Sequence, residues 1–290
     1  MDLLASFFRG IVEVWRGLPL GPFEKGCLKV LIVAFGIYFL VYVIERLWGT
    51  RTDNYRSRAF LHDLAYWFYY RSGIHDLLFM VAIIAVLEKP LSFLAADLFV
   101  SLPYAAQVAL YLVIGDFIAY WIHRAEHRFK FMWAFHTTHH SQERLTFATT
   151  TRFHPVEMIY HNLLAYVPLR IMGIDPTTWL PMYLAVQLYT AVQHTQIPWK
   201  LGPLYKIMAT PTFHSYHHSV DPAHHDRNFS NMFSLWDYLF GTVVRSDGPR
   251  PSRLGLENVR PASLLSTLVT PFRLLYDFYI VPARGTIDKP

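Results

Sequence analysis

The sequence predicts an all-α integral membrane protein: a helical bundle of about four spans, with a cytoplasmic, histidine-rich cap that holds a dinuclear metal site. Three observations predict it. The 290 residues are 53% hydrophobic and only 16% charged, which is too apolar for an ordinary soluble domain. Several apolar runs approach the roughly 20 residues that cross a bilayer. Thirteen of the fifteen histidines lie between His123 and His225.

The first half of the chain alternates apolar runs with basic and aromatic segments. Residues 1–22 alternate apolar and Arg positions, which is typical of a helix lying on the membrane surface. The first predicted span is 26–48. The aromatic segment 60–73 is expected at headgroup level, where amphipathic rings are favoured. The apolar run 77–100 is interrupted by a Glu-Lys-Pro sequence, so it is either one kinked span or a re-entrant hairpin.

The next predicted span leads into the first histidines. Ser101 and Pro103 form a cap and first-turn pair for this apolar helix. Because helical neighbours recur at three and four residues, Asp116, His123 and His127 fall on one face of it. That face is expected to meet protein rather than lipid.

Two more apolar helices follow the middle of the chain. His154 and Pro155 mark the entry to one of them, and Gly173 is its expected stop. The last long apolar run, 177–197, carries His194 in its final turn. Together with the spans before them, these helices give the count of about four.

Eight histidines recur at helical spacing in three boxes. H-x-x-x-H places two imidazoles one turn apart, and H-x-x-H-H, which occurs twice, places three on one helix face. A single metal ion takes about four to six donors, so eight rings indicate two metals held close together. Imidazole suits zinc, copper, iron or nickel, so the spacing alone leaves the metal open. The box histidines are His123, His127, His136, His139, His140, His214, His217 and His218.

The other histidines are interpreted one by one. His194 is a ninth candidate ligand, because it closes an apolar helix shortly before the third box. His154 is a further candidate, with capping of the following helix as the alternative. Isolated histidines near a membrane interface are usually polar anchors, and a His-His pair in a turn is typically solvent-facing. Those interpretations apply to His62, His75 and His161, and to His224 and His225, respectively.

The order and flanks of the boxes resemble a known family. D-x-x-x-Y-x-x-H-R-x-x-H is followed by W-x-F-H-x-x-H-H-S, then H-x-x-H-H, D-R-N-F and S-L-W-D-Y-L-F-G-T. This pattern resembles the fatty acid hydroxylase superfamily of sterol desaturase-like membrane oxygenases. It covers 116–243, the expected catalytic core of a single domain spanning 1–290. Ser230 departs from it, because members commonly have Gly there.

The resemblance implies a non-haem di-iron centre. Such a centre uses O2 and two electrons to hydroxylate or desaturate a lipid, an acyl chain or sterol-like substrate taken from the bilayer. When the residues of this family pattern are matched to the sequence one by one, the resemblance implies that the eight box histidines bind the two Fe ions. It implies His194 as the additional ligand. No further catalytic residue is expected beyond the metal centre.

Two polar residues are candidates for supporting the ligands. A carboxylate inside an apolar span costs about 2.5 to 3.5 kcal/mol, so Asp116 is expected to have a buried partner. Metal-bound imidazoles usually donate their second N–H to such a group, and Asp116 is therefore predicted to hold a histidine of the cage. The alternative is a structural Asp that pairs with Arg or Tyr away from the metals. Asn228, in the D-R-N-F sequence, is the second candidate.

Composition also limits the partners. With a single Cys27, no Gly-rich nucleotide loop and no haem motif, the electrons are expected from a separate donor, a reductase, ferredoxin or cytochrome b5-like protein. Lys and Arg form no basic stripe, so no nucleic-acid partner is expected.

Basic residues beside the boxes predict that the boxes face the cytoplasm, at the plasma or inner membrane of a bacterium or at the ER of a eukaryote. The alternative is a histidine-rich metal transporter or metal-binding membrane protein without oxygenase activity. A transporter would place ligands near the middle of the membrane, whereas these cluster at helix ends.

Overall fold

The computed structural model describes residues 21–50, 53–80, 83, 86–87, 89–94, 96–173, 176–199, 201–245, 248–259 and 263–281. Over these residues the chain is helical, and the sheet-type pairing is limited to one antiparallel bridge between Ser219 and Leu254. The predicted all-α class is confirmed. The surface helix predicted at the N-terminus lies outside the described residues.

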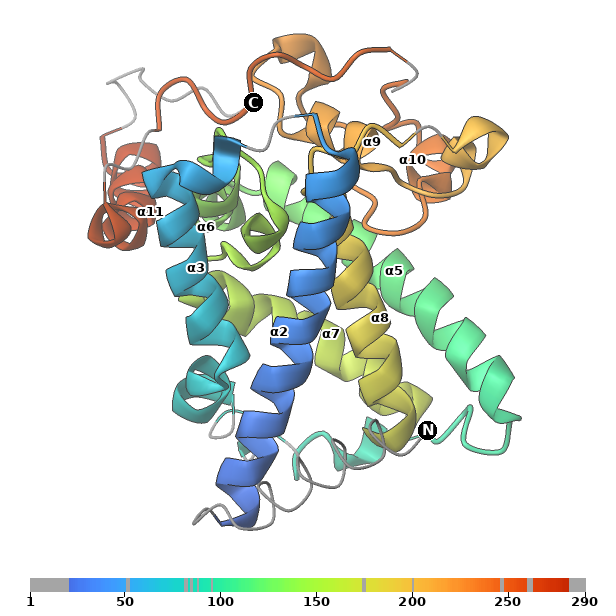
Figure 1. Cartoon of the computed structure of the whole chain (residues 1–290). Coiled ribbons are helices and arrows are strands. Elements are labelled where there is room, and N and C mark those ends of the chain that lie inside the picture. The colour runs from blue at the N-terminus through green and yellow to red at the C-terminus, as the bar shows by residue number, and fades with distance from the viewer. Residues whose placement is uncertain are drawn as a thin grey trace, which may run out of the picture.

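Within the part of the chain that the structure describes, seven helices of eleven or more residues form the framework (Figure 1). They are α2 Pro22–Trp48, α3 Arg58–Arg71, α5 Tyr104–Arg128, α6 Lys130–His140, α7 Pro155–Met172, α8 Pro176–Gln193 and α11 Leu264–Tyr279. The shorter elements are η1 Asp53–Arg56, η2 Asp76–Met80, η3 Ser92–Leu94, η4 Phe147–Thr151, η5 Gly202–Lys206, α9 Pro211–His217, η6 Pro222–His224 and α10 Leu235–Leu239.

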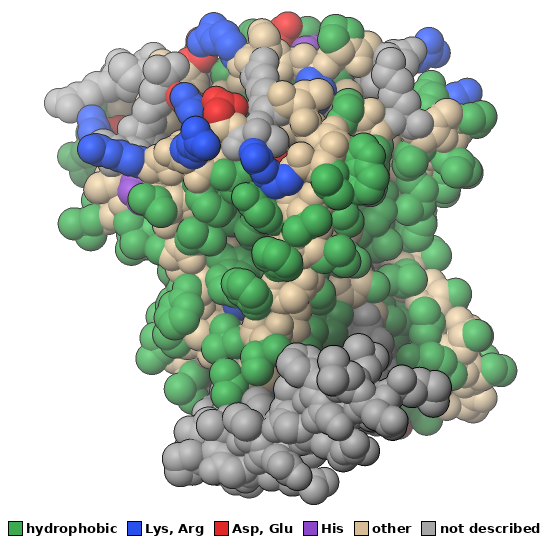
Figure 2. Space-filling model, in the orientation of Figure 1, with side chains coloured by type: hydrophobic (Ala, Val, Ile, Leu, Met, Phe, Trp, Pro, Cys, Tyr) green, Lys and Arg blue, Asp and Glu red, His purple; other side chains and the backbone are tan. Residues whose placement is uncertain are grey.

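Two of the described helices are long and apolar enough to cross a membrane. They are Leu31–Trp48 within α2 and Tyr104–Arg128, which is α5, and only 22% of each apolar window is buried inside the protein. Side chains such as Phe35 and Phe39 therefore point outward, at 63% and 55% exposure. On the face that Figure 2 shows, hydrophobic side chains cover the part of the protein formed by the long helices. Lys and Arg gather at the end that holds α9 and α10 in Figure 1. This distribution indicates a membrane protein.

The aromatic segment 60–73 is largely helical, and its place at headgroup level stays a prediction. It forms α3, which begins after Ser57, whose hydroxyl caps the helix by accepting from the Phe60 N–H at 3.1 Å. At its far end Arg71 donates to the hydroxyl of Tyr38, at 2.8 Å, and Tyr38 lies well inside α2. Helix α3 thus runs beside α2 because its polar groups find partners within the protein. Of 77–100 the structure describes only parts, including η2 and η3, so the choice between a kinked span and a re-entrant hairpin stays open.

Local signals set the ends of several helices. Helix α7 begins at Pro155, as predicted. Helix α5 begins at Tyr104 with Pro103 itself in the capping position and no side-chain cap, so the predicted cap at Ser101 with Pro103 in the first turn is wrong. Gly173 follows α7 with φ +66, and a Cβ there would lie 2.6 Å from the Asp97 backbone, so glycine is required on both counts. Helix α8 ends at Gln193, which places His194 in the turn after the helix rather than in its last turn.

Buried side chains connect the long apolar helices to the histidine-bearing end of the protein, which is called the cap. Ala34, Tyr38 and Val41 of α2 pack on Phe147 of η4 and Ala191 of α8. On the other side of the cap, α11 lies against α6. The sequence indicated only an apolar patch near the C-terminus. The structure shows that this patch is a helix covering the second histidine box.

Candidate metal centre

A sharp bend between two helices brings the first two boxes together. Helix α5 ends and α6 begins at Phe129, whose extended backbone, φ −102 and ψ 123, turns the chain back on itself. His123 and His127 on α5 therefore face the box on α6, and the rings of His127 and His140 approach to 3.0 Å between Nε2 atoms. Helical spacing on each side of the bend thus yields a two-sided cluster.

The third box and His194 close the cluster from two further directions. Helix α9 is started by Thr210, whose hydroxyl accepts from the Phe213 N–H, and by Pro211 at its first position. This short helix carries His214 and His217. The Nε2 atom of His214 lies 3.0 Å from that of His194. Segments more than ninety residues apart in the sequence meet here, since the rings of His123 and His217 are in contact.

The nine rings form two adjacent groups. In each group the ligand atoms lie within 4.8 Å of one another, and every member is buried. One group has five members, His123, His127, His136, His140 and His217, and the other has four, His139, His194, His214 and His218. The groups touch, because the rings of His140 and His218 stack with centroids 4.6 Å apart. The structure thus brings together the eight box histidines and His194.

Backbone and carboxylate acceptors orient the rings. The Nδ1 atoms of His123 and His217 lie 2.7 and 2.8 Å from the carbonyl oxygens of Phe229 and Arg227. A carbonyl can only accept, so each Nδ1 carries the proton and each Nε2 has a free lone pair. Those Nε2 atoms are buried and have no hydrogen-bond partner in the described structure. Leaving such atoms unpaired is costly, and metal binding would satisfy them.

Carboxylates support two further rings of the five-histidine group. The Glu157 Oε1 atom lies 2.6 Å from His136 Nδ1, and both side chains are buried. A second buried carboxylate, Glu126, lies 3.6 Å from the same nitrogen, beyond hydrogen-bonding distance. The half-exposed Asp226 lies 3.4 Å from His127 Nδ1. This carboxylate–histidine arrangement is typical of metal sites, where it fixes the ring tautomer and raises ligand basicity.

Replacing Glu157 by glutamine is expected to lower metal affinity of the five-histidine group about 10 to 100-fold. The amide keeps the shape and an acceptor oxygen but cannot accept a proton from His136 Nδ1. Glu126→Gln is the matched control, because this carboxylate is equally buried beside the same ring but makes no hydrogen bond to it. Metal titration of both variants measures the effect. Equal losses in the two variants would contradict the assignment of Glu157.

Burial lowers the pKa of six rings well below the usual histidine value, and the other rings nearby lower it further. At pH near 7 these rings are therefore neutral, which is the form that binds a metal ion. The six rings are His136, His139, His140, His214, His217 and His218.

These pKa shifts predict that acid destabilises the metal-free protein. The folded-state pKa of each ring lies below its unfolded value of about 6.5, so the unfolded chain binds more protons between the two values. Stability is therefore at its full value above about pH 6.5 and falls as pH decreases below it. Thermal unfolding with a chelator at about pH 7.5 and about pH 5.5 measures this difference, and we expect a midpoint several degrees lower in acid. Equal midpoints would contradict it.

The two predicted supporting residues lie elsewhere. Asp116 was expected to contact a cage histidine, but its carboxylate accepts from the N–H groups of Met232 and Phe233 and from Trp236 Nε1, at 2.8 to 2.9 Å. Asn228, with φ +56, donates to the Phe213 carbonyl and accepts from a backbone N–H. Among the described contacts, both shape the loop around Phe229, whose carbonyl holds His123.

His154 lies outside both groups. Its Nδ1 accepts from the Val156 N–H at 3.2 Å, and its Nε2 lies 3.1 Å from the Leu268 carbonyl. The ring therefore caps the start of α7 and joins it to α11. Of the alternatives that the sequence left open for this residue, capping is the one that its contacts match.

The sequence alone did not identify the carboxylates that lie beside the histidine rings, which are Glu126, Glu157 and Asp226. Glu126 lies in the first box itself, within H-R-A-E-H, and was available as a signal because a carboxylate in an apolar helix needs a partner. Glu157 lies in the first turn of α7, where acidic residues are common, so it gave no specific signal. Asp226 gave no signal, because its contact with His127 depends on how a loop folds back.

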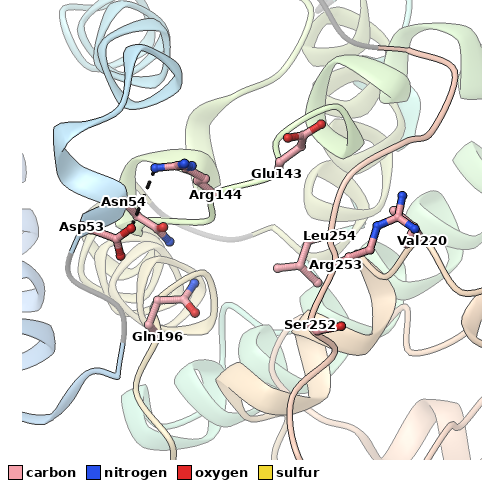
Figure 3. Close-up of a pocket in the computed structure, with 9 residues that line it drawn as sticks. All are labelled: Asp53, Asn54, Glu143, Arg144, Gln196, Val220, Ser252, Arg253 and Leu254. Carbon is pink, nitrogen blue, oxygen red and sulfur yellow. Dashed lines mark ion pairs between the residues drawn. The ribbon is translucent and has the colours of Figure 1, made fainter.

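Two pockets lie near the cap. One, of about 390 Å³, is polar and is lined by Asp53, Glu143 and Arg144 among others, but by none of the nine histidines (Figure 3). The other, of about 420 Å³, is lined by His127 of the five-histidine group. Of these two pockets, the second is therefore the one that borders the cluster.

Comparison with known proteins agrees with this arrangement. Residues 108–242 match the family described as fatty acid hydroxylase. The chain is 29% identical over 251 residues to the ornithine lipid hydroxylase OlsE of Rhizobium tropici, covering 83% of this chain and 75% of that protein. It is 27% identical to the very-long-chain aldehyde decarbonylase GL1-11 of Oryza sativa subsp. indica, covering 76% of this chain and 80% of that protein.

A third relative matches over a shorter region. Human alkylglycerol monooxygenase is 37% identical over 127 residues, covering 44% of this chain and 28% of that protein. The chain thus aligns with under a third of that relative. No solved structure matches the chain. The family match spans the segment that carries all nine clustered histidines, and over this segment the chain is similar to the fatty acid hydroxylase family.

Proposed function

We propose that the protein is a membrane-bound, non-haem di-iron oxidoreductase that uses O2 to hydroxylate or desaturate a lipid. The observation that carries the proposal is the pair of adjacent buried groups of five and four histidines. The known relatives include a lipid hydroxylase and a monooxygenase, which supports the same class of reaction. Bound iron would supply the reduction of O2 and the oxidation of an unactivated C–H bond.

The chain's own residues hold and isolate this chemistry. All nine rings are buried, so bulk water is kept from the centre. The carbonyls of Phe229 and Arg227 and the carboxylate of Glu157 keep three Nε2 atoms aimed inward. Nine neutral donors divide between two ions as five and four, within the usual coordination range. The residues present thus fit a dinuclear iron site.

The reaction needs electrons from outside the site. Hydroxylation takes O2, two electrons and two protons, places one oxygen atom in a C–H bond and releases the other as water. Desaturation uses the same inputs, removes two hydrogens from the lipid and releases two waters. We propose that a separate reductase, ferredoxin or cytochrome b5-like protein supplies the two electrons.

We further propose about four spans, α2, α5, α7 and α8, with the histidine cap on the cytoplasmic side. The gathering of Lys and Arg around the cap end supports this orientation (Figure 2). Glu143 is exposed on the cap, so a Glu143→Cys label in a Cys27→Ser background tests it. Labelling from the cytoplasmic side alone is expected. Labelling by an impermeant reagent added outside sealed cells would contradict it.

Metal and oxygen dependence test the enzyme class. We expect about two iron ions per chain and product formation that requires both O2 and an electron donor. The rival is a metal transporter or metal-binding protein, and the placement of the rings at the ends of α5, α6, α8 and α9 argues against it. Metal uptake into vesicles without any change in lipid composition would favour the rival. Turnover that persists without O2 would overturn the oxygenase.

A further inference from the structure

The pocket beside His127 lies at the end of a candidate span. It has a volume of about 420 Å³ and is formed by the last two turns of α5 together with the loop that carries Asp226 and Phe229. Since His127 belongs to the five-histidine group, a molecule in this pocket lies beside the proposed metal centre. This position makes the pocket the candidate site for the substrate of the proposed oxygenase.

Aromatic side chains form the outward rim of the pocket. Trp121 is 42% exposed and Phe129 is 59% exposed, and both line the cavity. The Trp121 ring also packs edge-on against Phe240, with centroids 5.0 Å apart. Exposed aromatic rings at the end of an apolar span are typical of the level where acyl chains meet headgroups. The rim thus faces the bilayer boundary.

Two arginines one helical turn apart line the same pocket. The Arg124 guanidinium lies 5.2 Å over the Trp121 ring, and its Nη1 donates to the Tyr120 hydroxyl at 3.1 Å. That bond uses one of its five N–H donors and holds the group in place. Arg128 is exposed at the rim. A pair of guanidiniums so placed matches a phosphate or a carboxylate.

The lining holds one acidic side chain beside two arginines, so its formal charge is positive. The acidic residue, Asp226, lies 3.4 Å from His127 Nδ1. On the side of the pocket formed by α5, the distance between Arg124 and His127 is set by the helix, because the two residues are three positions apart. Their Cβ atoms are therefore only about 5 to 6 Å apart. A headgroup held by the arginines would place nearby carbons against the cluster.

We propose that the substrate is a lipid with a net anionic headgroup, bound through its phosphate or carboxylate to Arg124 and Arg128 beside the five-histidine group. The carbon that is oxidised then lies near the polar end of the lipid rather than far along the chain. This inference rests on the proposed lipid oxygenation, since it assigns the substrate of that same site. The chain of the lipid passes the Trp121 and Phe129 rim into the bilayer.

Lipid binding to the full-length, metal-free protein tests the proposal without turnover. Native mass spectrometry compares retention of phosphatidylglycerol with phosphatidylcholine of the same acyl chains. The wild type is expected to prefer phosphatidylglycerol, and each Arg→Gln change at 124 or 128 is expected to reduce that preference roughly fivefold. Arg144→Gln is the matched control, because Arg144 has the same charge but lines the polar pocket of Figure 3. It is expected to leave the preference unchanged.

The outcomes separate this inference from the oxygenase itself. Arg128→Gln keeps the Tyr120–Arg124 bond, so it remains informative if the Arg124 variant is unstable. Unchanged preference in the Arg128 variant, or an equal loss with Arg144→Gln, would overturn the headgroup site. Displacement of the lipid by soluble glycerol phosphate would overturn it in favour of a free phosphate. The binding test uses no O2 or iron, so a negative result for the headgroup site does not contradict the proposed oxygenation. Conversely, if iron-dependent turnover were not found, the lipid-binding result would still be valid.

Discussion

Replacing His217 by alanine is expected to reduce bound iron from about two ions per chain to about one. Turnover should fall more than about 100-fold, beyond the loss expected for a residue that merely orients a ligand. The His217 ring lies 4.4 Å from that of His123 between centroids, and its buried Nε2 atom has no hydrogen-bond partner in the described structure. His214→Ala should remove iron from the four-histidine group in the same way. Iron analysis and single-turnover assays measure both effects.

His154→Gln is the matched control for these losses. His154 is as buried as the ligands and packs against Phe135 of the same helix that carries the second box, with ring centroids 4.9 Å apart. Its ring nitrogens contact backbone groups instead of the cluster. The variant is expected to keep full iron content. Full iron and full turnover in His217→Ala, or an equal iron loss in His154→Gln, would mean that the five-histidine group is not a metal site.

The sequence was sufficient to predict which histidines come together. Periodicity within a helix places His136, His139 and His140 on one face, and the bend at Phe129 then needs only to direct that face toward α5. His194 was identifiable because it closes an apolar helix near the third box. These features are local, and local geometry follows from a few residues of spacing.

The supporting network was not predictable, because it depends on contacts between distant segments. Asp116 shares a helical face with His123, yet the loop after Phe229 folds over it and takes its carboxylate through the N–H groups of Met232 and Phe233. Glu157 reaches His136 only once α7 packs beside α6. Periodicity gives the direction of a side chain from its own helix but does not identify what lies opposite.

The least predictable support is a buried ion pair beneath the second box. Asp63 of α3 is fully buried and receives Arg152 Nη1 at 2.8 Å, together with donors from Gln142 and Thr149 at 2.8 Å. The guanidinium of Arg152 also donates through Nε to the Thr138 carbonyl, at 2.9 Å. This pair therefore ties the end of α6, with its histidines, to α3. The sequence placed 60–73 at headgroup level and gave no reason to pair Asp63 with a residue 89 positions away.

Replacing Asp63 by asparagine is expected to destabilise the protein by about 3 to 5 kcal/mol, because Arg152 is left as an uncompensated buried charge. The side-chain volume hardly changes, so the effect reports charge rather than packing. In detergent this loss should lower the melting temperature by roughly 6 to 20 °C. Loosening of α6 should also weaken metal binding by both histidine groups, since His139 and His140 belong to different groups at the same helix end.

Asp53→Asn provides the matched comparison. Asp53 also pairs with an arginine, Arg144, but the distance is 3.9 Å and the two side chains are 73% and 52% exposed (Figure 3). Exposed pairs of this kind contribute little, so this variant should melt within error of the wild type. If Asp63→Asn and Asp53→Asn had equal melting temperatures, the buried pair would not secure the box. If Asp63→Asn lowered the melting temperature but left metal binding unchanged, the ion pair would stabilise the fold without positioning His139 and His140.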